Sequence, residues 1–359
     1  MMAGMVTPRR LPAARLLEGP VERALDDCGR PSSPVAVVDL TDLGTTPTSG
    51  TLDRLARAAE QSTVILVGCC EPEQTAALEP LLTSLCLTLV AGESGSSVPS
   101  TCIVTADPAS ATDALVAAIK RSPVAAAVLA DLLSRTASAS VPEGLVAESA
   151  AYSMLLASNE FATWRARNPA RPDAGPTEPA ALLERDGEDL TVTLNRPERH
   201  NAFSRWVRDA VCEGLDLALA DPTISRLTLR GNGPSFCSGG DLDEFGSQPD
   251  VAAAHHIRLE RSVGLRLHRV GATTVADVHG ACIGAGTELA AFADEVRAVA
   301  GTWFALPELS MGLIPGAGGT VSLPRRIGRW RTAWLAFSGA RLDLETALAW
   351  GLVDQRADI

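Results

Sequence analysis

Two glycine-rich turns lie between residues 277 and 320, and they constrain the fold and chemistry of this chain more than any other segment. The first turn, residues 280–286, precedes an apolar run that predicts a helix, after which a short strand is expected. The second turn, residues 315–319, follows a Pro-Glu step. Glycines ahead of a helix let the backbone approach a ligand closely and leave N–H groups free to stabilise negative charge. This stretch therefore predicts an oxyanion site.

Two carboxylates fall inside the same stretch. Glu288 lies in the first turn of the expected helix, and Glu308 follows the next strand. Either residue alone is an ordinary acid, since negative charge is favourable at a helix start. Two carboxylates that share a pocket can instead divide general acid and general base work between them. Their register with the two glycine turns favours this catalytic interpretation.

Upstream segments add to the same pattern. Residues 190–203 and 227–245 both begin with a strand-like run that breaks into a polar loop marked by Gly or Pro. The motifs NRPERHNAFS, FCSGGDLDEF, HGACIGAGTELA, FALPELSMGLIPGAGGT and GLVDQ follow one another in that order. Together they resemble the crotonase, or enoyl-CoA hydratase/isomerase, superfamily over about residues 180–355. The resemblance implies an α/β fold, a crotonase-like spiral of ββα units with two roughly perpendicular sheets, and a homo-oligomer, either a trimer or a dimer of trimers.

The resemblance also implies roles for individual residues. Gly240 and Ala285 correspond to the two backbone N–H donors of the oxyanion hole, although most relatives carry Gly where this chain has Ala285. Glu288 and Glu308 coincide with the two glutamates of the hydratases. Gly316 and Gly319 fall where the second glycine turn helps to hold water. The expected coenzyme A walls, contacted largely through the backbone, are His200, Asn201, Ala202, Ser238, Asp241 and Leu242.

Alternative roles are open for several of these positions. Asn201 and Asp241 are also suited to capping helices. The arginines available for coenzyme A phosphates are equally suited to be solvated surface charges; they are Arg196, Arg325, Arg326 and Arg329. Aromatic side chains are candidates for the pocket lining or for the packed core; they are Phe203, Phe236, Phe245, Trp303 and Phe304.

The presence of both glutamates favours hydration of a 2-enoyl-CoA to a 3-hydroxyacyl-CoA, which is a lyase activity in acyl-CoA metabolism. Coenzyme A would enter as part of the acyl-CoA thioester substrate, and no other cofactor is expected. The eight cysteines form no CxxC pair and no metal-like spacing with histidine, so no metal site is expected. The alternatives are a crotonase-type isomerase, a thioester hydrolase or dioxygenase of a biosynthetic pathway, and a non-catalytic acyl-CoA-binding paralogue.

The N-terminal half has an unusual organisation. Residues 1–33 predict a flexible head, residues 34–168 a degenerate α/β region ending in a helical cover, residues 169–181 a Pro-rich linker, and residues 182–359 the catalytic core. Apolar runs predict strands at 34–40, 63–70, 85–92 and 100–106, with a helix at 51–61. No catalytic constellation is visible before residue 110.

The helical segments at 110–122, 123–136 and 142–168 resemble the tail that normally ends a crotonase-type chain, but here they precede the core. Either the N-terminal half is a decayed crotonase-like unit, or its helices replace the missing C-terminal cover, in cis or from a neighbouring subunit. Both interpretations predict that residues 110–168 pack over or beside the pocket. A coincidental amphipathic bundle is the third possibility.

Charge and hydropathy restrict the kinds of partner. The net charge of −12 and the pI near 5.0 argue against nonspecific binding to nucleic acid or to an anionic membrane surface. Since no run of ~18 apolar residues occurs, the sequence predicts a soluble, cytoplasmic protein.

Overall fold

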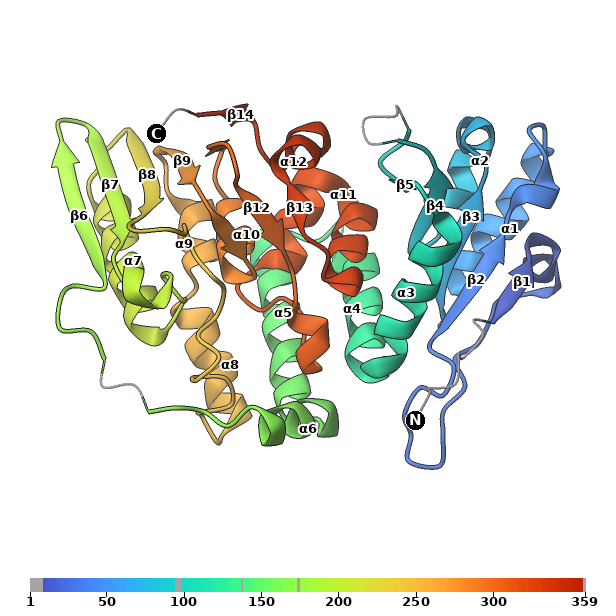
Figure 1. The fold of residues 1–359 in the computed structure, drawn as a ribbon, viewed down its shortest axis with the longest axis horizontal. Coiled ribbons are helices and arrows are strands. Elements are labelled where there is room, and N and C mark those ends of the chain that lie inside the picture. Colours follow the sequence, from blue (N-terminus) through green and yellow to red (C-terminus); the bar gives the residue numbers. More distant parts are fainter. Residues whose placement is uncertain (1–8, 94–97, 137, 173–174, 358–359) are drawn as a thin grey trace.

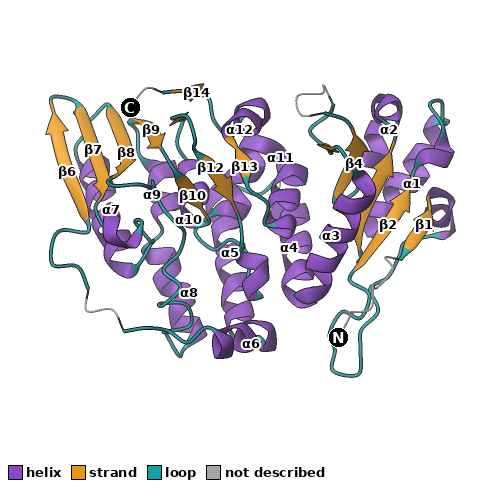
Figure 2. Ribbon diagram, viewed as in Figure 1, coloured by secondary structure: helices purple, strands orange, loops and turns teal. Residues whose placement is uncertain are grey.

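A computed structural model describes residues 9–93, 98–136, 138–172 and 175–357 of the chain. Its strands form one five-stranded, one six-stranded and one three-stranded sheet. Figure 1 shows the five-stranded sheet at one end of the molecule and the six-stranded sheet at the other, with helices α4 (Pro123–Thr136) and α5 (Val141–Leu156) between them. The expected mixed α/β class is therefore confirmed, and Figure 2 shows helices packed beside the strands in both halves of the molecule.

The five-stranded sheet is entirely parallel and its strands follow sequence order. Its elements are β1 (Arg10–Pro12), η1 (Ala13–Glu18), β2 (Val35–Asp39), η2 (Thr41–Leu43), α1 (Ser49–Gln61), β3 (Ile65–Cys70), η3 (Pro72–Gln74), α2 (Thr75–Leu82), β4 (Leu87–Ala91) and β5 (Cys102–Thr105). The four predicted strands and the helix at 51–61 are confirmed.

Alternate residues of each strand enter different cores. Val35 and Val37 of β2 pack with α3, α4 and the large core, while Ala36 and Val38 pack with η1, α1 and α2. This separation follows from the two-residue period of a strand. Because both faces are covered, the strands appear in the sequence as almost continuous apolar runs.

The flexible head predicted for residues 1–33 is wrong for the described part of that segment. Residues 10–12 form β1, which pairs in parallel with β2, and Ala13, Leu16 and Val21 are buried. The Val21 N–H also donates to the Ser62 hydroxyl at 2.8 Å. Strand pairing and burial of these short apolar residues outweigh the local Pro, Arg and Gly content. Residues 1–8 lie outside the described residues.

The helical cover region consists of α3 (Pro108–Arg121), α4 (Pro123–Thr136), α5 (Val141–Leu156) and α6 (Asn159–Arg167). Ser140 and Glu143 form a capping box at the start of α5. The segment expected as one helical run over 142–168 is divided, because Ser158 caps a new helix by accepting from the Phe161 N–H. In Figure 1, α6 lies beside the lower end of α5, whereas β6 (Ala181–Asp186) is the outer strand of the six-stranded sheet.

The C-terminal half has a second sheet in nearly sequential order, β14-β11-β9-β8-β7-β6, in which only the β6–β7 hairpin is antiparallel. Its elements are β6 (Ala181–Asp186), β7 (Asp189–Leu194), η4 (Pro197–Arg199), α7 (Arg205–Ala220), β8 (Arg226–Gly231), α8 (Val251–Glu260), α9 (Val263–Arg269), β9 (Thr273–Val278), β11 (Glu295–Ala298) and β14 (Gln355–Arg356). Each return to this sheet adds one turn of a spiral.

The small third sheet joins successive turns of that spiral. It contains β10, β12 and β13, and it is accompanied by three helices and a 3-10 turn. The elements are β10 (Ala281–Ile283), α10 (Ala285–Ala290), β12 (Trp303–Ala305), η5 (Glu308–Met311), α11 (Gly319–Ser338), β13 (Leu342–Asp343) and α12 (Leu344–Trp350). Two isolated β-bridges connect this sheet to loops that come earlier in the chain: Cys237 pairs with Cys282 of β10, and Phe203 pairs with Gly240. The loop before each helix is thereby held beside the loop of the next turn.

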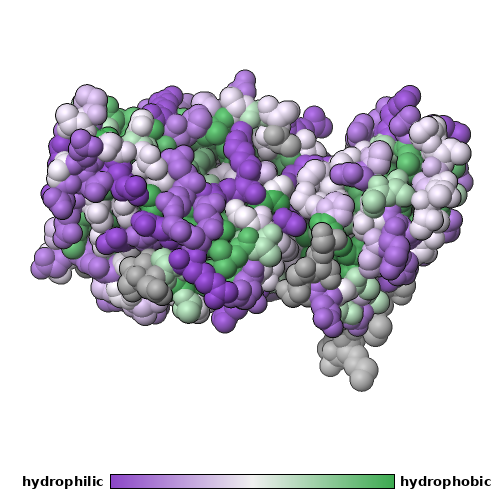
Figure 3. Space-filling view, turned by 90° about the horizontal axis from the view of Figure 1, so that it is seen from above, coloured by the Kyte–Doolittle hydropathy of each residue, from purple (hydrophilic) through white to green (hydrophobic). Residues whose placement is uncertain are grey.

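Seen from above, the molecule narrows between the part that holds the six-stranded sheet and the part that holds the five-stranded sheet, and hydrophilic side chains cover most of that face (Figure 3). Among the described residues, no helix is both long and apolar enough to cross a membrane.

Candidate active site

A cavity of about 520 Å³ lies where the two halves of the chain meet. Its walls come from α5 on the N-terminal side, and from the start of α7, the loop after Gly240, α8, α10 and the second glycine turn on the C-terminal side. The volume is typical of small-molecule sites. The prediction that residues 110–168 pack over or beside the pocket is confirmed for α5, which covers the cavity in cis.

Close packing brings α5 to this position. Gly144 faces Val321 of α11, and a methyl group built on Gly144 would lie 2.9 Å from a Val321 methyl. Tyr152, about two helical turns further along α5, lies against Gly316 so tightly that a methyl group on Gly316 would meet its ring at 2.4 Å. Larger residues at either glycine would push the helix away from the cavity.

The two proposed oxyanion donors both line the cavity. In the described part of the chain, neither the Gly240 N–H nor the Ala285 N–H has a protein acceptor. Ala285 is the first residue of α10, so its N–H is one of those that a helix leaves unpaired. At Gly240, the neighbouring backbone bonds with Phe203 are made by Gly239 and Asp241, which leaves the Gly240 N–H for another partner. The geometry therefore suits a bound oxyanion.

Glu288 is buried and held by the second glycine turn. Its Oε2 atom accepts hydrogen bonds from the Ala317 N–H at 2.7 Å and the Gly319 N–H at 2.8 Å. Gly319 is needed here because an added methyl would lie 2.5 Å from Glu288 Cγ. The Gly319 N–H therefore holds this glutamate, while the Gly316 N–H has no acceptor among the described residues.

Glu308 is also buried, but no other residue in the described part of the chain donates a hydrogen bond to its carboxylate; only its own backbone N–H stabilises the charged form. Oε2 has no hydrogen-bond partner among the described residues. Oε1 lies beside Gly284, where an added methyl would approach it to 2.4 Å. Gly284 also has a φ of 48°, a conformation that favours glycine. A buried carboxyl group with one unpartnered oxygen is more stable when protonated.

The structure adds a third buried carboxylate, Glu148 on α5, which sequence reasoning missed. It accepts from the Gly318 N–H at 2.7 Å, the Thr320 N–H at 2.9 Å and the Thr320 hydroxyl at 2.7 Å. Glu148 and Glu288 thus alternate along the turn and together bind four successive N–H groups. One sequence signal was present: Glu148 lies between Leu145 and Tyr152 at helical spacing, so a carboxylate occupies the apolar face of the helix.

All three carboxyl groups have a raised pKa. Burial raises the pKa of Glu148 to about 7 and, with the charge of Glu148, that of Glu308 to about 8. Burial and the charges of Glu308 and Glu148 raise the pKa of Glu288 well above its ordinary value. Three like charges this close cannot all be ionised near neutral pH. Because hydrogen bonds stabilise the ionised forms of Glu148 and Glu288, we assign the retained proton to Glu308.

This assignment predicts how stability depends on pH. A carboxyl whose pKa is higher in the folded than in the unfolded state makes the folded protein bind more protons, so the free energy of unfolding falls as pH rises. For Glu308 the window runs from its ordinary value of 4.5 to about 8. The free energy of unfolding, measured by chemical denaturation, should fall between pH 5 and pH 8 in the wild-type protein. In Glu308→Gln this fall should be smaller by on the order of 3 kcal/mol. The exposed Glu178→Gln is the control, and an equal loss in both variants would contradict the assignment.

The loops proposed to bind coenzyme A are adjacent in the structure. The Ser238 N–H donates to the His200 carbonyl at 3.0 Å. His200 and Leu242 are exposed, and Ala202 and Ser238 are half-buried. Of the six proposed residues, only Asp241 reaches the cavity lining. The cavity therefore extends from the oxyanion donors away from these loops.

Asn201 and Asp241 do not cap helices, so that alternative is wrong. Asn201 is fully buried; its side chain accepts from the Arg196 N–H and donates to the carbonyls of Asn232 and Ser235, each at 2.8 Å. Asp241 is paired with Arg199 at 3.0 Å. The helix that follows, α7, is capped by Ser204. Both side chains shape the loops, which leaves the loop backbone for a ligand.

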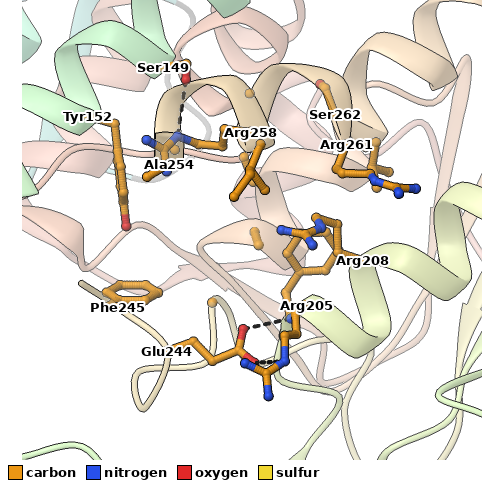
Figure 4. Close-up of a pocket in the computed structure, with 18 of the residues that line it drawn as sticks. Ser149, Tyr152, Arg205, Arg208, Glu244, Phe245, Ala254, Arg258, Arg261 and Ser262 are labelled. Carbon is orange, nitrogen blue, oxygen red and sulfur yellow. Dashed lines mark hydrogen bonds and ion pairs between the residues drawn. The ribbon is translucent and has the colours of Figure 1, made fainter. Parts of the chain in front are cut away.

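The four arginines suggested for coenzyme A phosphates do not line this cavity. Arg326 binds Asp354 and the carbonyls of Ala291 and Ala293, and Arg329 binds the Thr83 carbonyl. Of the aromatic candidates, Phe203 and Phe245 line the cavity, whereas Phe236 and Phe304 are packed in the core and Trp303 stacks with Arg341. Phe245 meets Tyr152 edge to face, with ring centroids 6.5 Å apart (Figure 4).

Comparison with known proteins places the C-terminal half among acyl-CoA enzymes. The sequence model of the enoyl-CoA hydratase/isomerase family matches residues 187–357. The chain is 37% identical over 174 residues to the 1,2-epoxyphenylacetyl-CoA isomerase of Escherichia coli (strain K12), covering 47% of this chain and 66% of that protein. It is 33% identical to the 2,3-dehydroadipyl-CoA hydratase of the same organism, covering 48% and 67%.

Two further similarities have the same extent. An enoyl-CoA isomerase/hydratase, fer4, of Mycosarcoma maydis is 33% identical and covers 49% of this chain and 70% of that protein. A solved structure of an enoyl-CoA hydratase from Thermoplasma volcanium GSS1 has 32% identity and a TM-score of 0.47, covering 51% of this chain and 73% of that one. The chain spans about two thirds of the length of the relatives it matches.

Proposed function

Since this chain belongs to the enoyl-CoA hydratase/isomerase family, we propose that it hydrates a 2-enoyl-CoA to a 3-hydroxyacyl-CoA. The resemblance drawn from the sequence motifs is thus confirmed at the level of the family. The observation that carries the specific reaction is one cavity lined by two unpaired backbone donors, Gly240 and Ala285, and by two carboxylates, Glu288 and Glu308. Relatives of this chain include a 2,3-dehydroadipyl-CoA hydratase and a 1,2-epoxyphenylacetyl-CoA isomerase, so both kinds of reaction occur among them.

In the proposed first step, the thioester oxygen accepts hydrogen bonds from the Gly240 and Ala285 N–H groups. These donors are fixed by the loops of two adjacent spiral turns, so they need no reorganisation as the oxygen becomes negative. Polarisation of the carbonyl makes C3 of the conjugated double bond electrophilic. The coenzyme A portion would run along the loops of residues 200–202 and 238–242, bound largely through the backbone.

In the second step, water held between the two glutamates attacks C3. Glu288, ionised and anchored through Oε2, takes a proton from that water through its other oxygen as the new C–O bond forms. The electrons of the double bond move to the thioester oxygen as an enolate. Collapse of the enolate draws a proton to C2 from the neutral carboxyl of Glu308. A proton shift from Glu288 to Glu308 then restores the starting state.

The test is direct. Purified protein is mixed with crotonyl-CoA and with longer and aromatic 2-enoyl-CoAs, and absorbance of the conjugated thioester is followed. We expect loss of the band and a product heavier by one water. A shifted double bond at unchanged mass would instead indicate an isomerase, and free coenzyme A a hydrolase. An oxygen-dependent product would indicate a dioxygenase. Retained acyl-CoA without any turnover would indicate a non-catalytic binding paralogue.

The homo-oligomer implied by the resemblance and the cytoplasmic location predicted from hydropathy are also part of this proposal. Within one chain, α5 already covers the cavity. Light scattering after size-exclusion chromatography would give the number of subunits.

A further inference from the structure

The far end of the cavity carries a concentration of positive charge. Four arginines line it: Arg205 and Arg208 from the start of α7, and Arg258 and Arg261 from the end of α8 (Figure 4). Arg205 is paired with Glu244. The other three have no carboxylate from another wall of the cavity within 4 Å among the described residues. A purely apolar acyl chain would not be stabilised by such a charged wall.

Arg258 is the most enclosed of these cations. Its Nη2 donates to the Ser153 hydroxyl at 2.6 Å and its Nε to the Ser149 hydroxyl at 3.2 Å. Its guanidinium carbon lies 4.7 Å from the centroid of the Tyr152 ring. These neutral partners orient the guanidinium but leave its charge uncompensated. The nearest acidic influence is Glu148, which already accepts three hydrogen bonds from the glycine turn.

Arg208 increases this excess of charge. It is close enough to Arg258 for its charge to disfavour the charged form of that residue. Within the described ranges its ion-pair partner is Asp209, the next residue on α7, which does not line the cavity. Figure 4 shows Arg208 reaching into the cavity from α7 on the side opposite Arg258. Two like charges that face one space favour an anion between them.

The position of these arginines indicates that the anion they would bind belongs to the acyl part of the substrate. The cavity contains the oxyanion donors, Glu288 and Glu308, but not His200, Asn201, Ala202, Ser238 or Leu242, where coenzyme A is proposed to bind. From the glutamates the walls continue through Tyr152 to Arg258. An acyl chain with its thioester at Gly240 and Ala285 would therefore extend toward the arginines.

We infer that the substrate is an enoyl-CoA whose acyl chain ends in a carboxylate, bound by Arg258 and Arg208. This inference rests on the proposed function. The planar guanidinium matches a carboxylate through paired N–H groups, and the enclosed site makes that pairing stronger than it would be in water. The chain between thioester and carboxylate lies against Phe203, Phe245 and Leu289.

The test compares two substrates of equal length, one ending in a methyl group and one in a carboxylate. The wild-type protein should have a kcat/KM at least about 10²-fold higher for the carboxylate form. Arg258→Gln should abolish that preference by lowering kcat/KM for the carboxylate form alone, and Arg258→Lys should restore part of it. Arg208→Gln, on the opposite wall, should act in the same direction. Arg269→Gln, an exposed arginine of α9 outside the cavity, is the matched control.

Equilibrium binding separates this inference from the proposed reaction. Saturated acyl-CoAs with and without the terminal carboxylate need no turnover, and calorimetry should show the same preference and its loss in Arg258→Gln. If no enoyl-CoA is hydrated but this preference is measured, hydration fails and the anion site stands. Equal affinity for the two saturated ligands would overturn the inference. So would an equal loss of affinity for free coenzyme A in Arg258→Gln, since the arginines would then serve the phosphates.

Discussion

Glu308→Gln is expected to lower kcat for hydration by roughly 10³-fold while leaving KM nearly unchanged. The amide has almost the shape of the carboxyl group and keeps one oxygen acceptor for the Glu308 N–H, and Oε2 has no partner among the described residues, so the substitution breaks no hydrogen bond to another residue. What it removes is the proton that C2 is proposed to receive. Steady-state kinetics with the substrate identified in the panel would measure the effect.

The matched control for this variant is Glu288→Gln. There the amide group must face the Ala317 and Gly319 N–H groups, which both donate to one carboxylate oxygen. The amide oxygen can still accept from both N–H groups, so Glu288→Gln should lose activity with little change in stability, whereas Glu308→Gln should lose activity and gain stability at alkaline pH. A Glu308→Gln protein with wild-type kcat would rule out the role given to Glu308. Retained binding of acyl-CoA by the inactive variant would exclude misfolding as the cause.

The local parts of this site were predictable because short segments determine them. A glycine turn before a helix leaves unpaired N–H groups wherever it occurs, so Gly240, Ala285 and the second turn could be named from spacing and resemblance. Glu288 and Glu308 are close to these turns in sequence. The strands of the N-terminal half were equally predictable from the sequence, since burial on both faces produces long apolar runs.

The remaining features depend on contacts between segments that are distant in the sequence. Glu148 and the turn it binds are separated by 170 residues or more, and no periodicity connects them. The N-terminal residues form β1 because the edge of β2 is available for pairing, and composition does not reveal that edge. The arginines of α7 and α8 follow ordinary helical patterns, and only the packing of α5 encloses them in a cavity.

The position of α5 also explains what the helical segment that precedes the core contributes to the site. It does more than shield the cavity, because it contributes Glu148 to the turn and Tyr152 to the wall. The N-terminal sheet supports this arrangement from behind, since its inner face packs in the same core as α3, α4 and α11. In the proposed mechanism, the N-terminal half therefore contributes by positioning the catalytic groups. The sequence had predicted no reacting group there.

Glu148→Gln is expected to reduce both stability and catalysis. The carboxylate accepts two N–H groups and one hydroxyl, and an amide can accept with only one of its two ends, so at least one buried donor loses its partner. An unsatisfied buried donor costs about 1–3 kcal/mol. Because the same turn holds Glu288, we expect kcat to fall about 10- to 100-fold with little change in KM. Thermal unfolding and steady-state kinetics would measure the two effects.

A pH profile distinguishes a positioning role from a purely structural one. The negative charge of Glu148 raises the pKa of both Glu288 and Glu308. Without that charge Glu308 should lose its proton at a lower pH, so the alkaline limb of the kcat profile should move toward acid. Thr320→Val removes one donor to Glu148, which raises the pKa of Glu148 but leaves a group that still ionises, so it should lower stability and move the limb less than Glu148→Gln does. If the limb of Glu148→Gln coincides with that of Thr320→Val, Glu148 only stabilises the turn and does not tune the catalytic pair.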